Sequence, residues 1–145
     1  MSIVIKFFLA PHDEAATAVV DRGPDGVFDS LVFGNFDATE AMIEWEGIFT
    51  GHSFDELVDA DEPRVVADPG NGEGPMLFVA SRALHDALAI ADQPKLAEVS
   101  ELWVRERAAD GEGIDPDVAA GILGDLAKLA RSSGGGNDRL YCWLA

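Results

Sequence analysis

Apolar residues occur at regular spacings near the start of the chain, in the pattern of a β-strand. Residues 2–10 read "SIVIKFFLA", so that every second residue from Ile3 to Leu9 is apolar, while Val4 and Phe8 lie with Lys6 on the opposite side. Alternation of this kind is typical of a strand, and apolar residues on both sides predict that both faces of the sheet are covered. We expect an interior strand.

Short helices are predicted where acidic or hydroxyl residues precede apolar ones. "PHDEAATAVV" favours a short helix with Pro11 in its first turn. "DATE" and "SFDE" each place an N-cap residue, Asp37 and Ser53, three positions before a glutamate. This is the spacing of a capping box, and it predicts helices over residues 38–46 and 54–59.

Three longer helices follow in the second half. Ser81 is a candidate N-cap for a helix that ends near Ile90, with Leu84 and Leu88 inward. Pro94 predicts a new helix that runs to about Ala108. Its expected buried stripe, and that of a third helix capped by Asp115, consist of apolar residues at helical spacing: Leu96, Val99 and Trp103, then Val118, Ile122, Leu126 and Leu129.

The remaining segments predict further strands. "VFDSLVFGNF", "PRVVAD", "MLFVA" and the final "RLYCWLA" are apolar or β-branched, and Gly-rich "PGNGEGP" and "SSGGGND" separate elements. The expected fold is α+β, with residues 1–145 as one domain. A mixed sheet that includes the N- and C-terminal strands would pack with four to five helices.

Charge narrows the classes of partner. The chain has 27 acidic and 10 basic residues, a formal net charge of −17, and no cluster of Lys and Arg in the sequence. Direct binding to nucleic acid or to anionic lipid is disfavoured, because both require clustered cations. An acidic surface favours either simple solubility, as a monomer or small homo-oligomer, or recognition of a basic protein.

The first residues and the single cysteine bear on location. The N-terminal apolar run is short, is interrupted by Lys6, and lacks the pattern of a secretory leader, so we expect a cytoplasmic protein without a membrane span. Cys142 lies between Tyr141 and Trp143. This setting favours a buried apolar role over a nucleophilic one.

Known catalytic and metal-binding motifs do not account for the polar residues. "GNGEGP" lacks the ending of a P-loop and the spacing of a calcium loop. The three histidines, His12, His52 and His85, each have an acidic neighbour, but none has the helical spacing of a zinc pair. We therefore assign no catalytic residue, no metal ligand and no cofactor.

The segment "IEWEGIFTGHSFDEL" is the strongest candidate for a binding site. Trp45 is expected in the core, with Glu44 and Glu46 pointing away from it. The turn after it brings polar side chains close to an aromatic one, so that a pocket would have its wall here, with His85 or Asp68 reaching in. The predicted binding residues are Trp45, Glu46, Thr50, His52, Asp68 and His85.

The order of several segments resembles a known family. "IEWEGIFTG", a Gly-rich loop, "GPMLFVASRALHDALA", two helices and the closing "RLYCWLA" are similar to the YfbM-like family of bacterial proteins of unknown function, over about residues 43–145. The first third is shorter here, and the turn after Thr50 is more acidic. The resemblance implies an α+β fold and supplies no activity or catalytic residue.

Two functional hypotheses follow. In the first, the protein is a non-enzymatic binding module, for example an immunity- or antitoxin-like protein, that recognises a basic protein. In the second, it is a small-ligand-binding protein or hydrolase with a His/carboxylate pocket near Trp45, using His52 or His85. The charge and the lack of a catalytic motif favour the first.

Overall fold

The first and last strands of the protein lie side by side near the centre of one sheet. The computed structural model describes residues 4–34, 36–132 and 138–145. The described strands pair in the order β2-β1-β5-β4-β3. Their bounds are β1 Val4–Ala10, β2 Ser30–Gly34, β3 Arg64–Ala67, β4 Met76–Val79 and β5 Arg139–Leu144. The prediction that the terminal strands share a sheet is confirmed.

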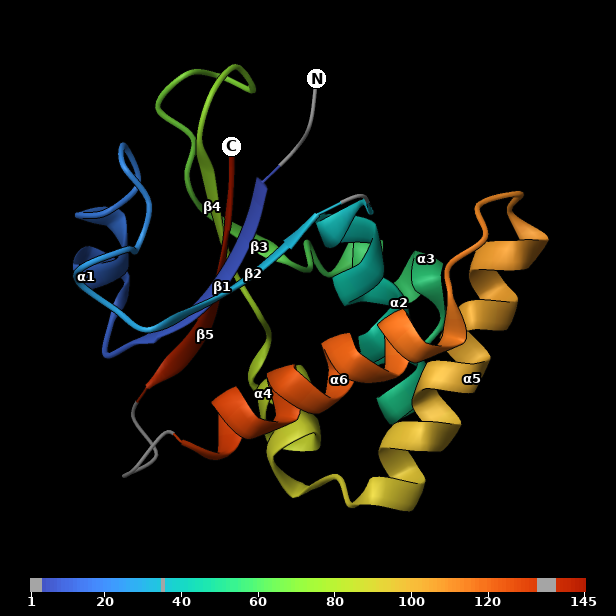
Figure 1. The fold of residues 1–145 in the computed structure, drawn as a ribbon. Coiled ribbons are helices and arrows are strands. Elements are labelled where there is room, and N and C mark those ends of the chain that lie inside the picture. Colours follow the sequence, from blue (N-terminus) through green and yellow to red (C-terminus); the bar gives the residue numbers. More distant parts are fainter. Residues whose placement is uncertain (1–3, 35, 133–137) are drawn as a thin grey trace.

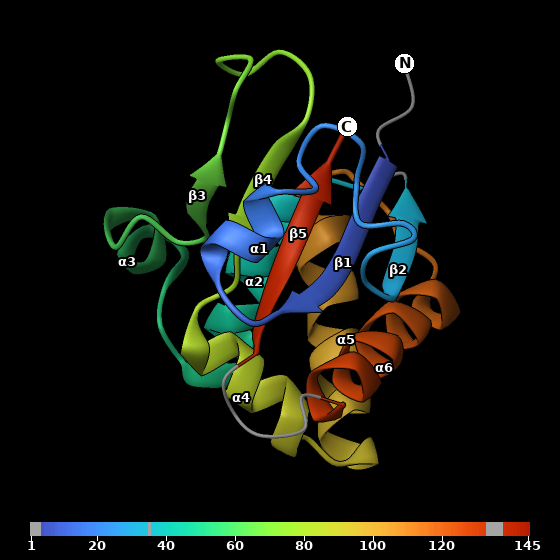
Figure 2. The ribbon, with the colours of Figure 1, turned by 90° about the vertical axis from the view of Figure 1, so that its left-hand side faces the viewer.

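Helices cover the sheet unequally on its two faces. Helices α2, α4, α5 and α6 form a layer on one side, and α1 lies on the other (Figures 1 and 2). The bounds of the helices are α1 Asp13–Thr17, α2 Ala38–Thr50, α3 Phe54–Asp59, α4 Arg82–Ile90, α5 Gln93–Ala109 and α6 Pro116–Arg131. The α+β class is confirmed, with six helices in the described residues where four to five were expected.

The sheet differs from the expected mixed sheet, since each pair of neighbouring strands is antiparallel. The sequence indicates where strands occur but not the direction in which distant ones meet. Here the long helical connection from β4 through α4, α5 and α6 returns the chain so that β5 enters between β1 and β4 in the opposite sense.

Both faces of β1 are buried, as its pattern predicted. Ile5 and Phe7 belong to the larger core beneath the four-helix layer. Phe8 and Ala10 belong to a smaller core on the side of α1, which also contains Trp143. As predicted, β1 is therefore an interior strand. It pairs with a strand on each side, and apolar side chains pack on each of its faces.

The predicted N-caps are confirmed, but only the second of the two capping boxes is complete, because the side chain of Glu40 binds Arg107. Asp37 accepts a hydrogen bond from the backbone N–H of Glu40, and Ser53 forms a complete capping box with Glu56. Ser81 and Asp115 cap α4 and α6 as expected. These signals work because the capping side chain and the N–H that it accepts are three residues apart or fewer.

Three expectations about helices were wrong. Helix α2 ends at Thr50 and not at residue 46, because the glycine that stops it is Gly51, whose φ of +84° is left-handed. Pro11 precedes α1, whose N-cap is His12. Val118 is 52% exposed, because the buried stripe of α6 begins with Ala119, which is fully buried, and Val118 lies beside that stripe.

Gly47 lies inside α2 for a steric reason. A Cβ atom placed on it would come within 2.9 Å of the backbone oxygen of His52. The absence of a side chain thus lets the chain fold back closely after α2 and begin α3. This return places the start of α3 beside the last two turns of α2.

The structure also bears on the single cysteine and on membrane-spanning helices. Cys142 is fully buried, as predicted. Within the three described ranges, none of the helices has the length and apolar character needed to cross a membrane. Residues 133–137 of the predicted Gly-rich stop after α6 lie outside the described residues.

Candidate functional site

An arginine occupies the inward-facing stripe of α5. The buried positions of this helix are Leu96, Val99, Ser100, Trp103 and Arg107, at helical spacing. Arg107 is only 4% exposed although it carries a charge. Since an unpaired buried charge is strongly unfavourable, its surroundings must supply carboxylates.

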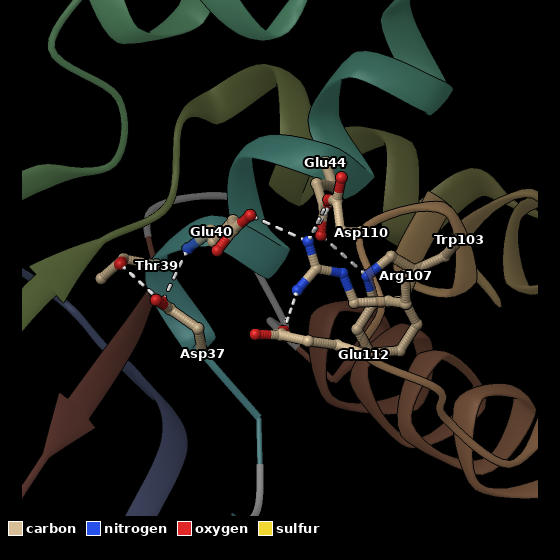
Figure 3. A network of polar contacts seen from close by, with 8 residues as sticks. All are labelled: Asp37, Thr39, Glu40, Glu44, Trp103, Arg107, Asp110 and Glu112. Atoms are coloured by element: carbon tan, nitrogen blue, oxygen red, sulfur yellow. Dashed lines mark hydrogen bonds and ion pairs between the residues drawn. The ribbon is translucent and has the colours of Figure 1, made fainter. Parts of the chain in front are cut away.

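Four carboxylates surround the Arg107 guanidinium group (Figure 3). Its Nη2 lies 2.8 Å from Glu40, 2.9 Å from Glu44 and 2.9 Å from Asp110. Its Nη1 lies 2.6 Å from Glu112. One positive charge therefore meets four negative ones, and the two hydrogens of Nη2 are shared among three acceptors. We call these five residues the Arg107 cluster.

Glu44 is the most deeply buried acid of the Arg107 cluster. One of its oxygens accepts from Arg107, and the other accepts from Trp103 Nε1 at 3.1 Å. The indole of Trp103 in turn packs edge to face on Trp45, with ring centroids 5.1 Å apart. Both oxygens of the carboxylate are thus held by buried donors, so the cluster connects α2 to α5 rigidly.

Burial alters the acidity of this region. Desolvation raises the pKa of Glu44 above its ordinary value, although the hydrogen bond from Trp103 and the charge of Arg107 oppose the shift. Desolvation also raises the pKa of Glu106, one residue before Arg107. For Arg107, burial acts to lower the pKa, but Glu40 and Glu44 outweigh it and raise the pKa. The arginine is charged at any physiological pH.

A cavity of about 500 Å³ opens beside the Arg107 cluster, between α2, α3 and the end of α5. One part of its wall is acidic, formed by Glu40, Glu44, Glu106 and Asp110. The rest is apolar or weakly polar, formed by Ile43, Gly47, Ile48, His52, Ser53, Phe54 and Ala109. We call this space the acidic cavity. Arg107 is the neighbouring cation, and four carboxylates leave a net negative field.

The carboxylates at this cavity also have the spacing of a cation site. Oxygens of Glu40, Glu44 and Asp110 lie within 4.8 Å of one another. However, Nη2 of Arg107 donates to all three of them. The guanidinium group therefore acts as the resident cation of this trio, and Glu106 is the acidic side chain of the cavity wall to which it donates no hydrogen bond.

The structure separates the six predicted binding residues. His52 lines the acidic cavity, with Nδ1 3.4 Å from Glu56. Trp45 is fully buried in the core. Thr50 donates its hydroxyl to the backbone oxygen of Glu46, one turn earlier in α2.

The other predicted residues lie elsewhere. Glu46 accepts a hydrogen bond of 2.6 Å from Ser81, the N-cap of α4. Asp68 accepts from the backbone N–H of Gly72 in a loop. His85 is buried on α4, where desolvation lowers its pKa. His85 and Asp68 therefore do not line the cavity, because Asp68 is held in its own loop and His85 is buried on α4.

The expectation that Glu44 and Glu46 point away from the core was wrong. They are 8% and 6% exposed respectively. Each carboxylate is buried because it accepts hydrogen bonds from residues distant in the sequence. Arg107 and Trp103 donate to Glu44, and Ser81 donates to Glu46. Helical periodicity alone predicts that acidic residues face water. It cannot predict these donors, because they lie 35 to 63 residues away in the sequence.

The sequence contains a partial signal for the Arg107 cluster. Arg107 continues the stripe of Leu96, Val99 and Trp103 by one further step of four residues. A charged residue on an apolar stripe predicts a buried ion pair. Glu40 and Glu44 are likewise four residues apart, on α2. The sequence therefore indicates an acidic face on α2 and a basic position on α5, but it does not indicate that the two are in contact.

Comparisons with protein families, with curated proteins and with solved structures found no match to this chain. The resemblance to the YfbM-like family stays a prediction.

Proposed function

We propose that this protein is a non-enzymatic binding module that recognises a basic protein, in the manner of an immunity protein or antitoxin, by receiving a Lys or Arg side chain in the acidic cavity. The observation that carries the proposal is the division of the cavity wall into a carboxylate end and an apolar end. A Lys or Arg side chain is divided in the same way, into a cationic head and an aliphatic stem.

Glu106 is the acid best placed to meet an incoming cation. It lines the acidic cavity, and its carboxylate makes no hydrogen bond or ion pair with any residue in the described ranges, whereas Glu40, Glu44 and Asp110 already bind Arg107. Glu106 is an exposed residue of α5, and desolvation and the charge of Asp110 raise its pKa although the charge of Arg107 opposes the shift. A guanidinium or ammonium group in the cavity would stabilise its charged form.

The charge of the whole chain supports the same partner. A net charge of −17 steers basic proteins toward the surface at long range, and the cavity supplies a specific contact at short range. For the alternative, a small-ligand-binding protein or hydrolase, His52 is the one predicted binding residue among those that line the acidic cavity. Its neighbour Ser53 uses its hydroxyl to accept the backbone N–H of Glu56, which is a capping role.

The test is fluorescence anisotropy with a labelled oligo-arginine peptide, from about 50 mM to about 500 mM NaCl. The wild-type protein is compared with Glu106→Gln and with the matched control Glu101→Gln. Glu101 is an exposed acid on the same helix, outside the acidic cavity. We expect Glu106→Gln to weaken binding about tenfold and Glu101→Gln to weaken it less than about twofold. Equal effects of the two variants would show diffuse attraction only and refute the proposal.

A further inference from the structure

A second cavity, of about 620 Å³, collects cations on this acidic chain. It lies on the α1 side of the protein, and three of the ten basic side chains line it: Arg64, Arg82 and Arg139. They come from the first residue of β3, of α4 and of β5. We call this space the arginine cavity. Guanidinium groups repel one another, so their convergence on a protein of charge −17 requires an explanation.

Resident acids explain part of the arrangement. Arg64 Nη2 lies 3.0 Å from Asp13, and the Tyr141 hydroxyl donates to the other oxygen of Asp13 at 2.7 Å. Asp13 is therefore held by two donors. The pKa of Asp13 is lowered first by the Tyr141 hydrogen bond and then by Arg64, against some desolvation. This carboxylate accounts for Arg64 and leaves two arginines.

The other two arginines have donors to spare. The guanidinium group of Arg82 makes no hydrogen bond or ion pair with a residue in ranges 4–34, 36–132 and 138–145. Arg139 donates Nη2 to the backbone oxygen of Ala80 at 3.1 Å, while its buried Nε has no partner among the same residues. The Arg139 Nε is too buried to meet a ligand, but the exposed guanidinium group of Arg82 can donate to an oxyanion in the cavity.

Two further groups add to the positive character of this cavity. Arg82 is the first residue of α4, so the positive end of that helix dipole lies beside it. His12 accepts the backbone N–H of Ala15 with Nδ1, which places the proton of the neutral imidazole on Nε2. That N–H is a further donor at the cavity wall.

From this convergence we propose that the arginine cavity binds the phosphate group of a small phosphorylated molecule. The Asp13 carboxylate is already met by one N–H of Arg64 and by the Tyr141 hydroxyl, whereas a phosphate dianion has three oxygens for the donors of Arg82, Arg139 and His12. The volume exceeds that of a phosphate alone, so the remainder of a small ligand has room. Glu14, also on the wall, would set a negative boundary to the site.

The test is an NMR titration of the isotope-labelled full chain with inorganic phosphate at about pH 7.5 and constant ionic strength, with acetate as the monoanion comparison. We expect saturable shifts of the backbone amides of Arg82 and Arg139, and acetate binding at least about tenfold weaker. Arg82→Gln should weaken phosphate binding about tenfold, because it removes a fork that has no protein partner. Its own spectrum reports whether it is folded.

The control is Arg105→Gln, which removes the same charge from an exposed position on α5. It should leave phosphate affinity within about twofold of the wild type. The proposal is overturned if phosphate gives no saturable shift up to about 50 mM, if acetate binds as well as phosphate, or if both arginine variants lose affinity equally. None of these results bears on the acidic cavity, which lies on other helices.

Discussion

Substitution of Arg107 by methionine tests the energetics of the Arg107 cluster. Methionine keeps an unbranched side chain of similar reach and removes the charge. Glu44 would then remain buried, with a side chain only 6% exposed and Trp103 as its one neutral donor. Removing one partner of a buried ion pair destabilises proteins by about 3–5 kcal/mol. For a chain of this length, the expected fall in Tm is about 8–15 °C.

The assay is urea denaturation followed by tryptophan fluorescence at pH 7. The matched control is Arg105→Met, an exposed change on the same helix, which should alter the free energy of unfolding by less than about 0.5 kcal/mol. The double variant Arg107→Met/Glu44→Gln should be more stable than Arg107→Met alone, with an interaction energy of about 1–3 kcal/mol. A loss below about 1 kcal/mol for Arg107→Met would refute the reasoning.

The same variant should depend on pH in a defined direction. The pKa of Glu44 is already raised by desolvation, and loss of Arg107 removes an opposing effect and raises it further. A group with a folded-state pKa above its unfolded value favours the folded state at low pH, and this contribution is lost as pH rises through the folded pKa. The deficit of Arg107→Met should therefore shrink between about pH 7 and pH 4. A constant deficit would contradict this account.

Three smaller predictions test other contacts. Ser81→Ala removes both the α4 cap and the donor to Glu46, and should lower the free energy of unfolding by about 1–3 kcal/mol in urea, more than Ser53→Ala does at the exposed α3. Asp13→Asn should be less stable than the wild type by under about 1 kcal/mol at pH 7, and the difference should vanish as pH falls through the lowered pKa of Asp13; a difference that persists in acid would contradict it. Cys142 is fully buried and burial raises the pKa of its thiol, so a thiol reagent should modify it only in denaturant, and rapid native modification would show that β5 opens.

The parts of the fold that the sequence predicted are those decided by near neighbours. Asp37, Ser53, Ser81 and Asp115 cap their helices through contacts within three residues, so their roles were visible before the structure. The burial of β1 on both faces was likewise visible from alternation. The length of α2 was not, because Gly47 reads as a helix stop until the close approach of the His52 backbone is known.

The candidate sites depend on contacts between distant segments. Glu44 and Arg107 are 63 residues apart, and Arg64 and Asp13 are 51 apart. Neither pairing follows from local spacing, since any of the 27 acids was an available partner for either arginine. The sequence showed that Arg107 continues an apolar stripe, and with that signal the cluster would have been expected on α5 although its acids would not have been assigned.

The most direct measurement on the proposed function is the position at which a basic peptide contacts the protein. Backbone amide shifts of the labelled protein are recorded during titration with an oligo-arginine peptide at about 150 mM NaCl, where distant charges are largely screened. The account predicts that the largest shifts occur around the acidic cavity, at Ile43, Gly47, Ile48 and Glu106. Small shifts spread over all exposed acidic segments, without a maximum at these residues, would contradict it.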